Sequence, residues 1–137
     1  MKDRVDFETA KLLKEKGFDE VTDQSYWGYE GGPECMTSHG PYDSPGYGFP
    51  APTLLEASRW LRKTHRIIVI ADYNYEYTDT SYYYKIYQVD ESGKPKPVEV
   101  ALDNRTVHMN YTMSYSDYKE YEEAMSEGIK YCLKNLL

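Results

Sequence analysis

The segment from residue 66 to residue 89 constrains the fold of this chain more than any other. Residues 67–70 are four consecutive aliphatic side chains, and the residues that follow alternate between polar side chains and tyrosines as far as Thr78. An aliphatic run indicates a strand covered on both faces, whereas alternation indicates a strand with one open face. A second strand-like run covers residues 82–89. The pattern therefore predicts a long antiparallel hairpin.

A two-residue turn at positions 79–80 is expected to set the register of this hairpin. The cross-strand pairs on one face are then Tyr77 with Tyr82, Tyr75 with Tyr84 and Tyr73 with Ile86, and on the other face Glu76 with Tyr83 and Asn74 with Lys85. Aromatic cross-strand pairs stabilise a sheet by up to about 1 kcal/mol each. The pattern predicts an aromatic ladder, made of Tyr73, Tyr75, Tyr77, Tyr82 and Tyr84.

Tyrosine is used unusually often in this chain, with 16 tyrosines against 3 phenylalanines and 2 tryptophans. A tyrosine ring packs well on a pleated strand, and this structural use is the favoured explanation for most of them. Tyrosine also suits binding surfaces, because a large rigid ring loses little entropy on binding. Bases stacked on aromatic rings normally have cations beside them, and only Lys85 lies near the ladder. We therefore expect an unidentified protein partner, with a small ligand as the alternative, rather than nucleic acid.

Residues 19–52 contain six glycines and five prolines interleaved with aromatic residues. This composition disfavours regular structure, apart from one short strand near residues 20–29. The aromatic content argues against disorder, so we expect an ordered loop laid over the core. Trp27, Tyr29 and Tyr47 join the ladder tyrosines as candidate binding residues.

Three segments carry the signals of helices: residues 7–16, 53–64 and 117–136. Asp6 is a suitable N-cap for the first helix, and Gly17 stands where a left-handed residue ends a helix. Thr53 and Glu56 form a capping box at the start of the second. Gly128 in the third helix costs about 1 kcal/mol relative to alanine, which indicates a close approach to the sheet.

A second hairpin is expected around a type I′ turn at residues 103–104, with strands near 98–102 and 107–111. A chain of 137 residues fits a single domain with one core. The order of elements predicts an α+β fold over residues 1–137. We expect two layers, with an antiparallel sheet of about four strands and three helices packed mainly on one face.

Three segments also resemble a known group of proteins: AKLLKEKGF at 10–18, APTLLEASRWLRKTH at 51–65 and YEEAMSEGIKYCL at 121–133. They look like a family of small uncharacterised proteins of similar length and element order, found in gut bacteria, their phages and mobile elements. The matching residues are helix caps and core faces, so the resemblance implies a shared fold rather than a chemistry. It also implies an accessory role in a phage or mobile element.

The formal net charge is −7, which argues against a phosphate-binding surface and favours a soluble domain. The chain starts without the apolar region of a signal peptide, and no apolar run is long enough to span a membrane. Cys35 and Cys132 lie far apart in the sequence. We therefore expect a cytoplasmic protein with two free thiols and no association with membranes.

The sequence gives little support for catalysis. Cys35 and His39 have a spacing that could begin a zinc site, but no second close pair of ligands follows, and no orienting group supports Cys35 as a nucleophile. Nucleotide-binding and metalloprotease motifs are absent from the sequence. We therefore expect no metal, no cofactor and no catalytic residues.

Three hypotheses for function remain. The leading one is a non-catalytic protein-interaction module that uses the aromatic ladder and the loop. The second is a small-ligand-binding protein or small enzyme in which residues 26–49 form the lid of a pocket. The third is an acidic inhibitor that mimics nucleic acid, which requires carboxylates in rows on one face. The sequence leaves the oligomeric state open.

Overall fold

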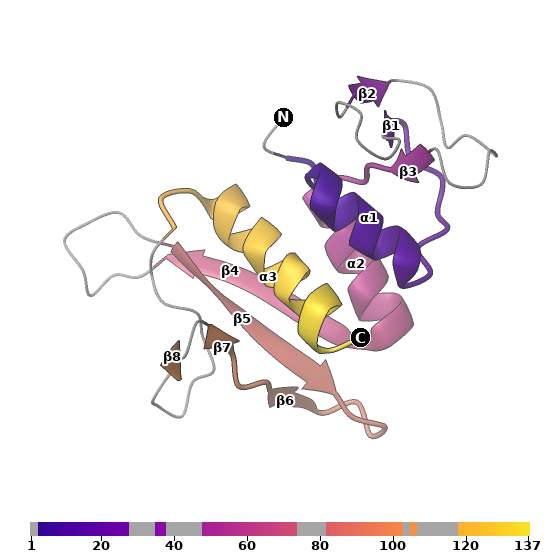
Figure 1. The fold of residues 1–137 in the computed structure, drawn as a ribbon. Helices are drawn as coiled ribbons and strands as arrows, with labels where there is room; N and C mark the ends of the chain where they lie inside the picture. Colours follow the sequence, from indigo (N-terminus) through magenta and orange to yellow (C-terminus); the bar gives the residue numbers. More distant parts are fainter. Residues whose placement is uncertain (1–2, 28–34, 38–47, 74–81, 103–104, 107–117) are drawn as a thin grey trace.

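The computed structural model describes residues 3–27, 35–37, 48–73, 82–102, 105–106 and 118–137 (Figure 1). The helices are α1 (Phe7–Glu15), α2 (Leu54–His65) and α3 (Tyr121–Asn135). The strands are β1 (Ser25–Trp27), β2 (Cys35–Thr37), β3 (Gly48–Pro50), β4 (Ile67–Tyr73), β5 (Tyr82–Val89), β6 (Pro95–Pro97), β7 (Ala101–Leu102) and β8 (Arg105–Thr106). The predicted α+β class with three helices and antiparallel strands is confirmed.

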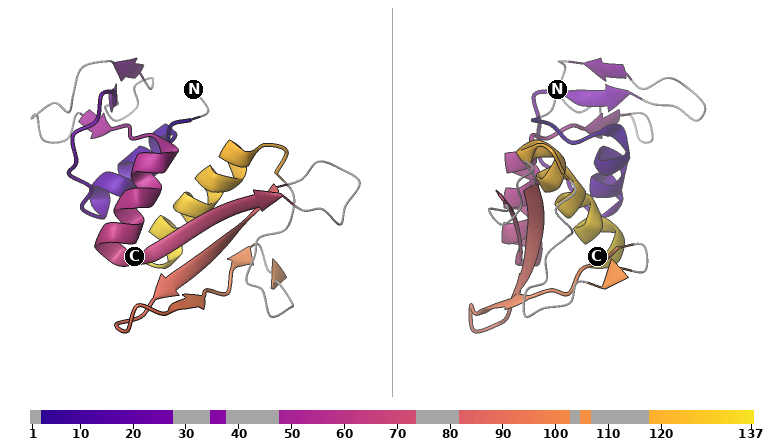
Figure 2. Two further views of the ribbon diagram at one scale, coloured as in Figure 1. Left: turned by 180° about the vertical axis from the view of Figure 1, so that it is seen from behind. Right: turned by 90° about the vertical axis from the view of Figure 1, so that its left-hand side faces the viewer.

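The strands divide into three antiparallel sheets within the described residues. β4, β5 and β6 form the main sheet in that order, β2, β1 and β3 form a second one, and β7 pairs with β8. Helix α3 packs across one face of β4 and β5, and α1 and α2 both contact α3 (Figures 1 and 2). The second sheet lies beside α1 at the other end of the molecule.

The hairpin of β4 and β5 forms as predicted, but its predicted register is wrong. Tyr82 pairs with Tyr73 instead of Tyr77, and Tyr84 pairs with Ala71 instead of Tyr75. The described part of β4 ends at Tyr73, and the expected turn at 79–80 lies outside the described residues. The observed register brings apolar side chains of both strands under α3, and this burial outweighs the gain from aromatic pairing.

The core lies between α3 and the main sheet. Its fully or almost fully buried side chains include Val69, Tyr84 and Ile86 from the sheet, Ile129, Cys132 and Leu133 from α3, and Leu13, Trp60 and Leu61 from the other two helices. Gly128 faces the sheet so closely that an added Cβ would lie 2.7 Å from Val69 Cγ1 and 3.0 Å from Tyr84 Cγ. The close approach expected at this glycine is confirmed.

The two N-terminal helices begin and end where the sequence predicts. The Asp6 carboxylate accepts a hydrogen bond from the Thr9 amide, and Gly17 has a φ of 98° with the Phe18 amide bonded back to Leu13 O. At the start of α2, both hydrogen bonds of the capping box between Thr53 and Glu56 are present. Local side-chain chemistry defines these ends, because a cap satisfies amides that the helix itself leaves free.

The third helix begins later than predicted, at Tyr121 rather than near residue 117. Tyr118 lies in an isolated antiparallel bridge with Tyr82, and the Tyr82 amide donates to Tyr118 O at 2.7 Å. The residue before the helix, Glu120, makes no side-chain cap. The backbone pairing with β5 therefore keeps Tyr118 out of the helix. Tyr121, the first residue of α3, is 48% exposed.

Two other expectations concern the loop and the second hairpin. The short strand expected near residues 20–29 is confirmed as β1, and the loop also contributes β2 and β3. The turn expected at residues 103–104 is flanked by Leu102 and Arg105 as a directly paired couple, so the start of the second hairpin is confirmed. Its expected continuation at 107–111 lies outside the described residues. β6 pairs with β5 and is a strand that the sequence did not predict.

Candidate functional site

The predicted binding residues do not gather at one place in the described structure. Tyr73, Tyr82 and Tyr84 lie on the same face of the β4–β5 hairpin, whereas Trp27 ends β1 in the other sheet. The other four candidates, Tyr75, Tyr77, Tyr29 and Tyr47, lie outside the described residues. The sequence brought these positions together by residue type, whereas the fold places β1 and the β4–β5 hairpin in different sheets.

Tyr84 is a core residue rather than a binding residue. Its side chain is only 1% exposed, and it packs beneath α3 between the rings of Tyr118 and Tyr131. Burial is the largest reason why the pKa of the Tyr84 phenol is raised well above its ordinary value. A ring held in this position stabilises the fold and is inaccessible to a partner.

A smaller aromatic cluster remains at the distal end of the hairpin. The rings of Tyr73 and Tyr82 meet edge to face at 5.3 Å between centroids, and Tyr121 at the start of α3 contacts Tyr82 at 6.4 Å. Tyr73 and Tyr82 are half-buried, and Tyr121 is exposed. The cluster joins two tyrosines of the predicted ladder in a pair that was not predicted, and it adds a ring from the helix.

The opposite face of the hairpin carries a set of side chains that the sequence did not single out. We call it the outer face, and it consists of Ile68, Ile70 and Asp72 on β4 and Tyr83, Lys85 and Tyr87 on β5. In the view from behind, β4 and β5 lie in front of α3, and α2 stands beside the start of β4 (Figure 2). No described helix lies across the middle of this face, and Ile70 is 41% exposed.

An outer face of this composition is unusual for a sheet that meets water. Antiparallel sheets with one open face normally place polar side chains there. Here the directly opposed pairs are Ile68 with Tyr87, Ile70 with Lys85 and Asp72 with Tyr83. The sequence signal was the apolar run at 67–70, which indicated cover on both faces. The incorrect register concealed the composition of the outer face, because it placed Tyr83 opposite Glu76 and Lys85 opposite Asn74.

The polar groups on the outer face have little to bind within the described chain. Lys85 Nζ lies 5.5 Å from the centroid of the Tyr83 ring, a cation–π contact. The Asp72 carboxylate accepts one hydrogen bond, from the Tyr73 amide at 2.8 Å. Among the described residues, neither Asp72 nor Lys85 has an ion-pair partner. The face therefore presents apolar surface together with one anion and one cation.

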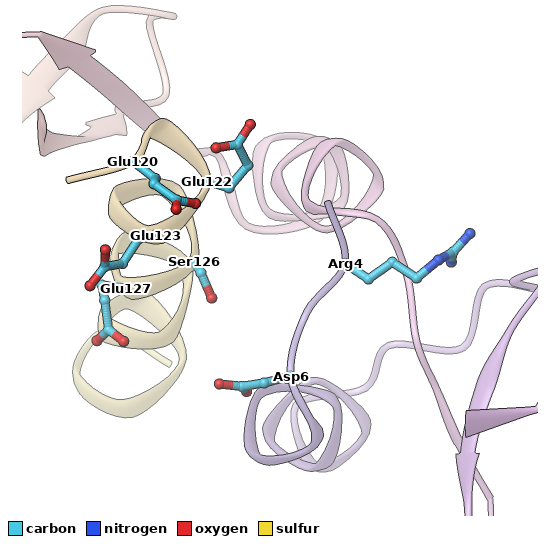
Figure 3. A pocket seen from close by; sticks show the side chains of 7 residues that line it. All are labelled: Arg4, Asp6, Glu120, Glu122, Glu123, Ser126 and Glu127. Atoms are coloured by element: carbon cyan, nitrogen blue, oxygen red, sulfur yellow. The ribbon is translucent and has the colours of Figure 1, made fainter. Parts of the chain in front are cut away.

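A groove of about 380 Å³ lies between the start of α3 and the segment that leads into α1. Figure 3 shows Glu120, Glu123 and Glu127 following one another along α3, with Asp6 pointing towards this helix. The remaining lining residues are Arg4, Glu122 and Ser126. The guanidinium of Arg4 points away from α3, and it binds Ala51 O and the Asp23 carboxylate. The groove is therefore acidic and open.

Lys130 pairs with several carboxylates, among them those of Asp6 and Glu127, which line the acidic groove. Its Nζ lies 2.9 Å from Asp6, 3.4 Å from Glu8 and 3.8 Å from Glu127. Burial opposes the charge on Asp6, but hydrogen bonds from Thr9 and Lys130 outweigh it and hold its pKa below the ordinary value. These contacts tie α3 to the N-cap of α1, so they have a structural role.

The described residues offer no constellation for metal binding or thiol chemistry. No group of three or more His, Cys, Asp or Glu side chains that could hold a metal ion exists in this part of the chain. Cys132 is buried in α3, and burial raises the pKa of its thiol to about 12, so it carries almost no thiolate at neutral pH. Cys35 begins β2, and His39 lies outside the described residues.

Within the described ranges, none of the helices combines the length and apolar character needed to span a lipid bilayer. Comparison with protein-family models, with curated proteins and with solved structures found no match for this chain. The resemblance to small proteins of phages and mobile elements stays a prediction from the sequence.

Proposed function

We propose that this chain is a non-catalytic protein-interaction module and that it binds its partner through the outer face of the β4–β5 hairpin. The observation that carries the proposal is the apolar and aromatic surface of Ile70, Tyr83 and Tyr87, which no described helix covers. Burial of such a face by a partner is favourable, because it removes apolar surface from water.

The side chains on the outer face suit protein binding in particular. Tyr83 and Tyr87 each bring a rigid ring with a hydroxyl that has no hydrogen-bond partner among the described residues. Aromatic residues are enriched at the cores of protein interfaces, and the two isoleucines add aliphatic surface between them. The surface is a sheet face rather than an enclosed pocket, which favours a protein over a small ligand.

The biological setting is part of the same proposal. The resemblance at 10–18, 51–65 and 121–133 supports an accessory protein of a phage or mobile element that acts in the cytoplasm of its bacterial host. We propose that its partner is a host or phage protein, which is compatible with the outer face.

Affinity purification with a matched pair of variants tests the proposal. The tagged wild-type chain, Ile70→Lys and Leu55→Lys are each used as bait in a lysate of the native host, and retained proteins are identified by mass spectrometry. Leu55 is the matched control, because it is an aliphatic residue 77% exposed on α2, away from the outer face. We expect a protein that wild type and Leu55→Lys retain and Ile70→Lys loses.

A protein retained equally by all three baits would contradict the assignment of the outer face. Far-UV circular dichroism of the three chains is the control for folding. The monomer is expected to tolerate Ile70→Lys, because the position is exposed and repulsion from the directly opposite Lys85 should cost no more than about 1 kcal/mol.

The acidic groove supports the nucleic-acid-mimic hypothesis less well. Glu120, Glu123 and Glu127 follow one another on one side of α3, which is the beginning of a row of carboxylates. Lys130 and Lys134 follow them in the next turns and pair with Glu8 and Glu127. The alternation of sign along α3 therefore favours a helix tied to its neighbours over a surface that imitates a phosphate backbone.

A further inference from the structure

We infer that the partner seated on the outer face is a second copy of this chain, in a two-fold dimer that packs the two hairpins face to face. The inference rests on the proposed function, because it names the occupant of the same surface. It is carried by the arrangement of charge on the face.

Asp72 and Lys85 occupy diagonal positions on the outer face. Asp72 lies opposite Tyr83, and Lys85 lies opposite Ile70 in the next pair along the hairpin. Diagonal neighbours on one face of an antiparallel sheet are separated by about 7–8 Å. No ion pair joins Asp72 and Lys85 in the described structure, and Lys85 Nζ lies over the Tyr83 ring instead. The anion and the cation therefore both remain available to a partner, one on each side of a common centre.

A two-fold axis that passes through this centre, and that lies in the plane between the two sheets, makes the face complementary to itself. The axis exchanges the two diagonal positions, so Asp72 of each copy faces Lys85 of the other, and two ion pairs form. The other diagonal, from Ile70 to Tyr83, then lies close to the axis. Each of these side chains meets its own equivalent there, which places apolar surface at the middle of the interface and charges around it.

The overall charge of the chain gives this face a particular importance for self-association. Two copies that each carry a net charge of −7 repel one another, and the repulsion grows as the salt concentration falls. The outer face is formally neutral, with one anion and one cation. A second copy therefore meets opposite charges here, and sheet faces about 10 Å apart interdigitate apolar side chains as in a β-sandwich.

Sedimentation velocity and light scattering of the purified full chain test the inference through a charge exchange. Asp72→Lys places two cations on the outer face, and Lys85→Asp places two carboxylates there. Each variant alone should raise the dimer dissociation constant by at least about tenfold, because like charges then face each other twice. Mixing the two variants in equal amounts should restore dimers, since every cation again faces a carboxylate.

The outcomes separate this inference from the proposed function. A wild-type chain that is monomeric up to about 100 μM, a concentration at which weak specific dimers still form, would overturn the dimer. Wild-type dimers with no recovery in the mixture would also overturn the arrangement argued here. If the chain is monomeric but Ile70→Lys still loses a captured host protein, the dimer fails and the proposed function stands. If the chain is monomeric and nothing is captured, both fail.

Discussion

Gly128→Ala is the substitution whose effect the packing of this fold determines most directly. In an isolated helix the change is favourable, because alanine is a better helix former than glycine by about 1 kcal/mol. In α3 the new methyl group would lie 2.7 Å from Val69 Cγ1 and 3.0 and 3.1 Å from two ring carbons of Tyr84. The favourable helix propensity of alanine is therefore opposed by the close contacts of its methyl group.

The contacts decide which effect is larger. Val69 and Tyr84 are both buried, so neither has free space into which it can move. An extra methyl group in a closely packed core typically costs about 1–3 kcal/mol. A 2.7 Å contact with a branched side chain belongs to the upper part of that range. After subtraction of the helix-propensity gain, we expect Gly128→Ala to lower the free energy of unfolding by about 1–2 kcal/mol.

Equilibrium urea unfolding measures this difference. Ser126, a partly exposed residue in the same helix, provides the matched control, because Ser126→Gly should be about 1 kcal/mol less stable than Ser126→Ala. At position 128 the order of glycine and alanine should be reversed. Val69→Ala should remove most of the penalty, so that the double variant is no less stable than Val69→Ala alone. Gly128→Ala that is as stable as the wild type, or a penalty unchanged in the Val69→Ala background, would refute the close packing of α3 on the sheet.

Four further predictions concern stability. Thr53→Ala removes the hydrogen bond that the Glu56 amide donates to Thr53 Oγ1, and it should lower the free energy of unfolding by about 1 kcal/mol in urea unfolding; no change would contradict the cap. Arg66 ends α2 in the left-handed conformation, with φ 57° and ψ 36°, which glycine adopts without strain. Arg66→Gly should therefore raise the melting temperature and stabilise the chain by about 0.5–1 kcal/mol. A lower melting temperature would show that the contribution of the arginine side chain outweighs the strain. Hydrogen bonds hold the pKa of Asp6 below its unfolded-state value. Asp6 therefore stabilises the fold at pH values above the unfolded-state pKa, and this stability is lost as the pH falls through the folded-state pKa. Asp6→Asn should flatten the decline in the free energy of unfolding between about pH 5 and 2, as measured by urea unfolding. Tyr84→Ala should cost about 3–5 kcal/mol and Tyr83→Ala less than about 1 kcal/mol, and equal losses in thermal unfolding would contradict the assignment of the two faces.

The ends of the first two helices could be predicted because their signals are local. Asp6, Gly17 and the pair Thr53 and Glu56 act within one turn of the backbone, and a cap is recognisable from residue type and spacing alone. Gly128 was informative for a related reason, since a glycine inside a helix is unfavourable unless something lies close to it. The sequence could not show that this neighbour is Val69 and Tyr84, because that depends on which residues of the sheet come under α3.

The register of the hairpin could not be predicted from the hairpin itself. Aromatic pairing favours Tyr75 opposite Tyr84, whereas the structure places Ala71 there and packs the Tyr84 ring under α3 against Tyr131. Pairing contributes up to about 1 kcal/mol, whereas burying an aliphatic or aromatic side chain contributes about 1.5–3 kcal/mol. The larger energy belongs to contacts with a helix that follows more than thirty residues later. A rule based on turn length weighs only the smaller energy.

The size of the register error explains why the fold class survived it and the binding site did not. Tyr84 lies opposite Ala71 instead of Tyr75, an even shift, and an even shift leaves every side chain on its original face of a strand. The apolar face therefore remained apolar and still required a helix to cover it. A binding surface depends instead on which side chains are neighbours, and each of those changed. Lys85 moved from a position opposite Asn74 to one opposite Ile70, beside Asp72, and that neighbourhood is the one on which a self-complementary interface depends.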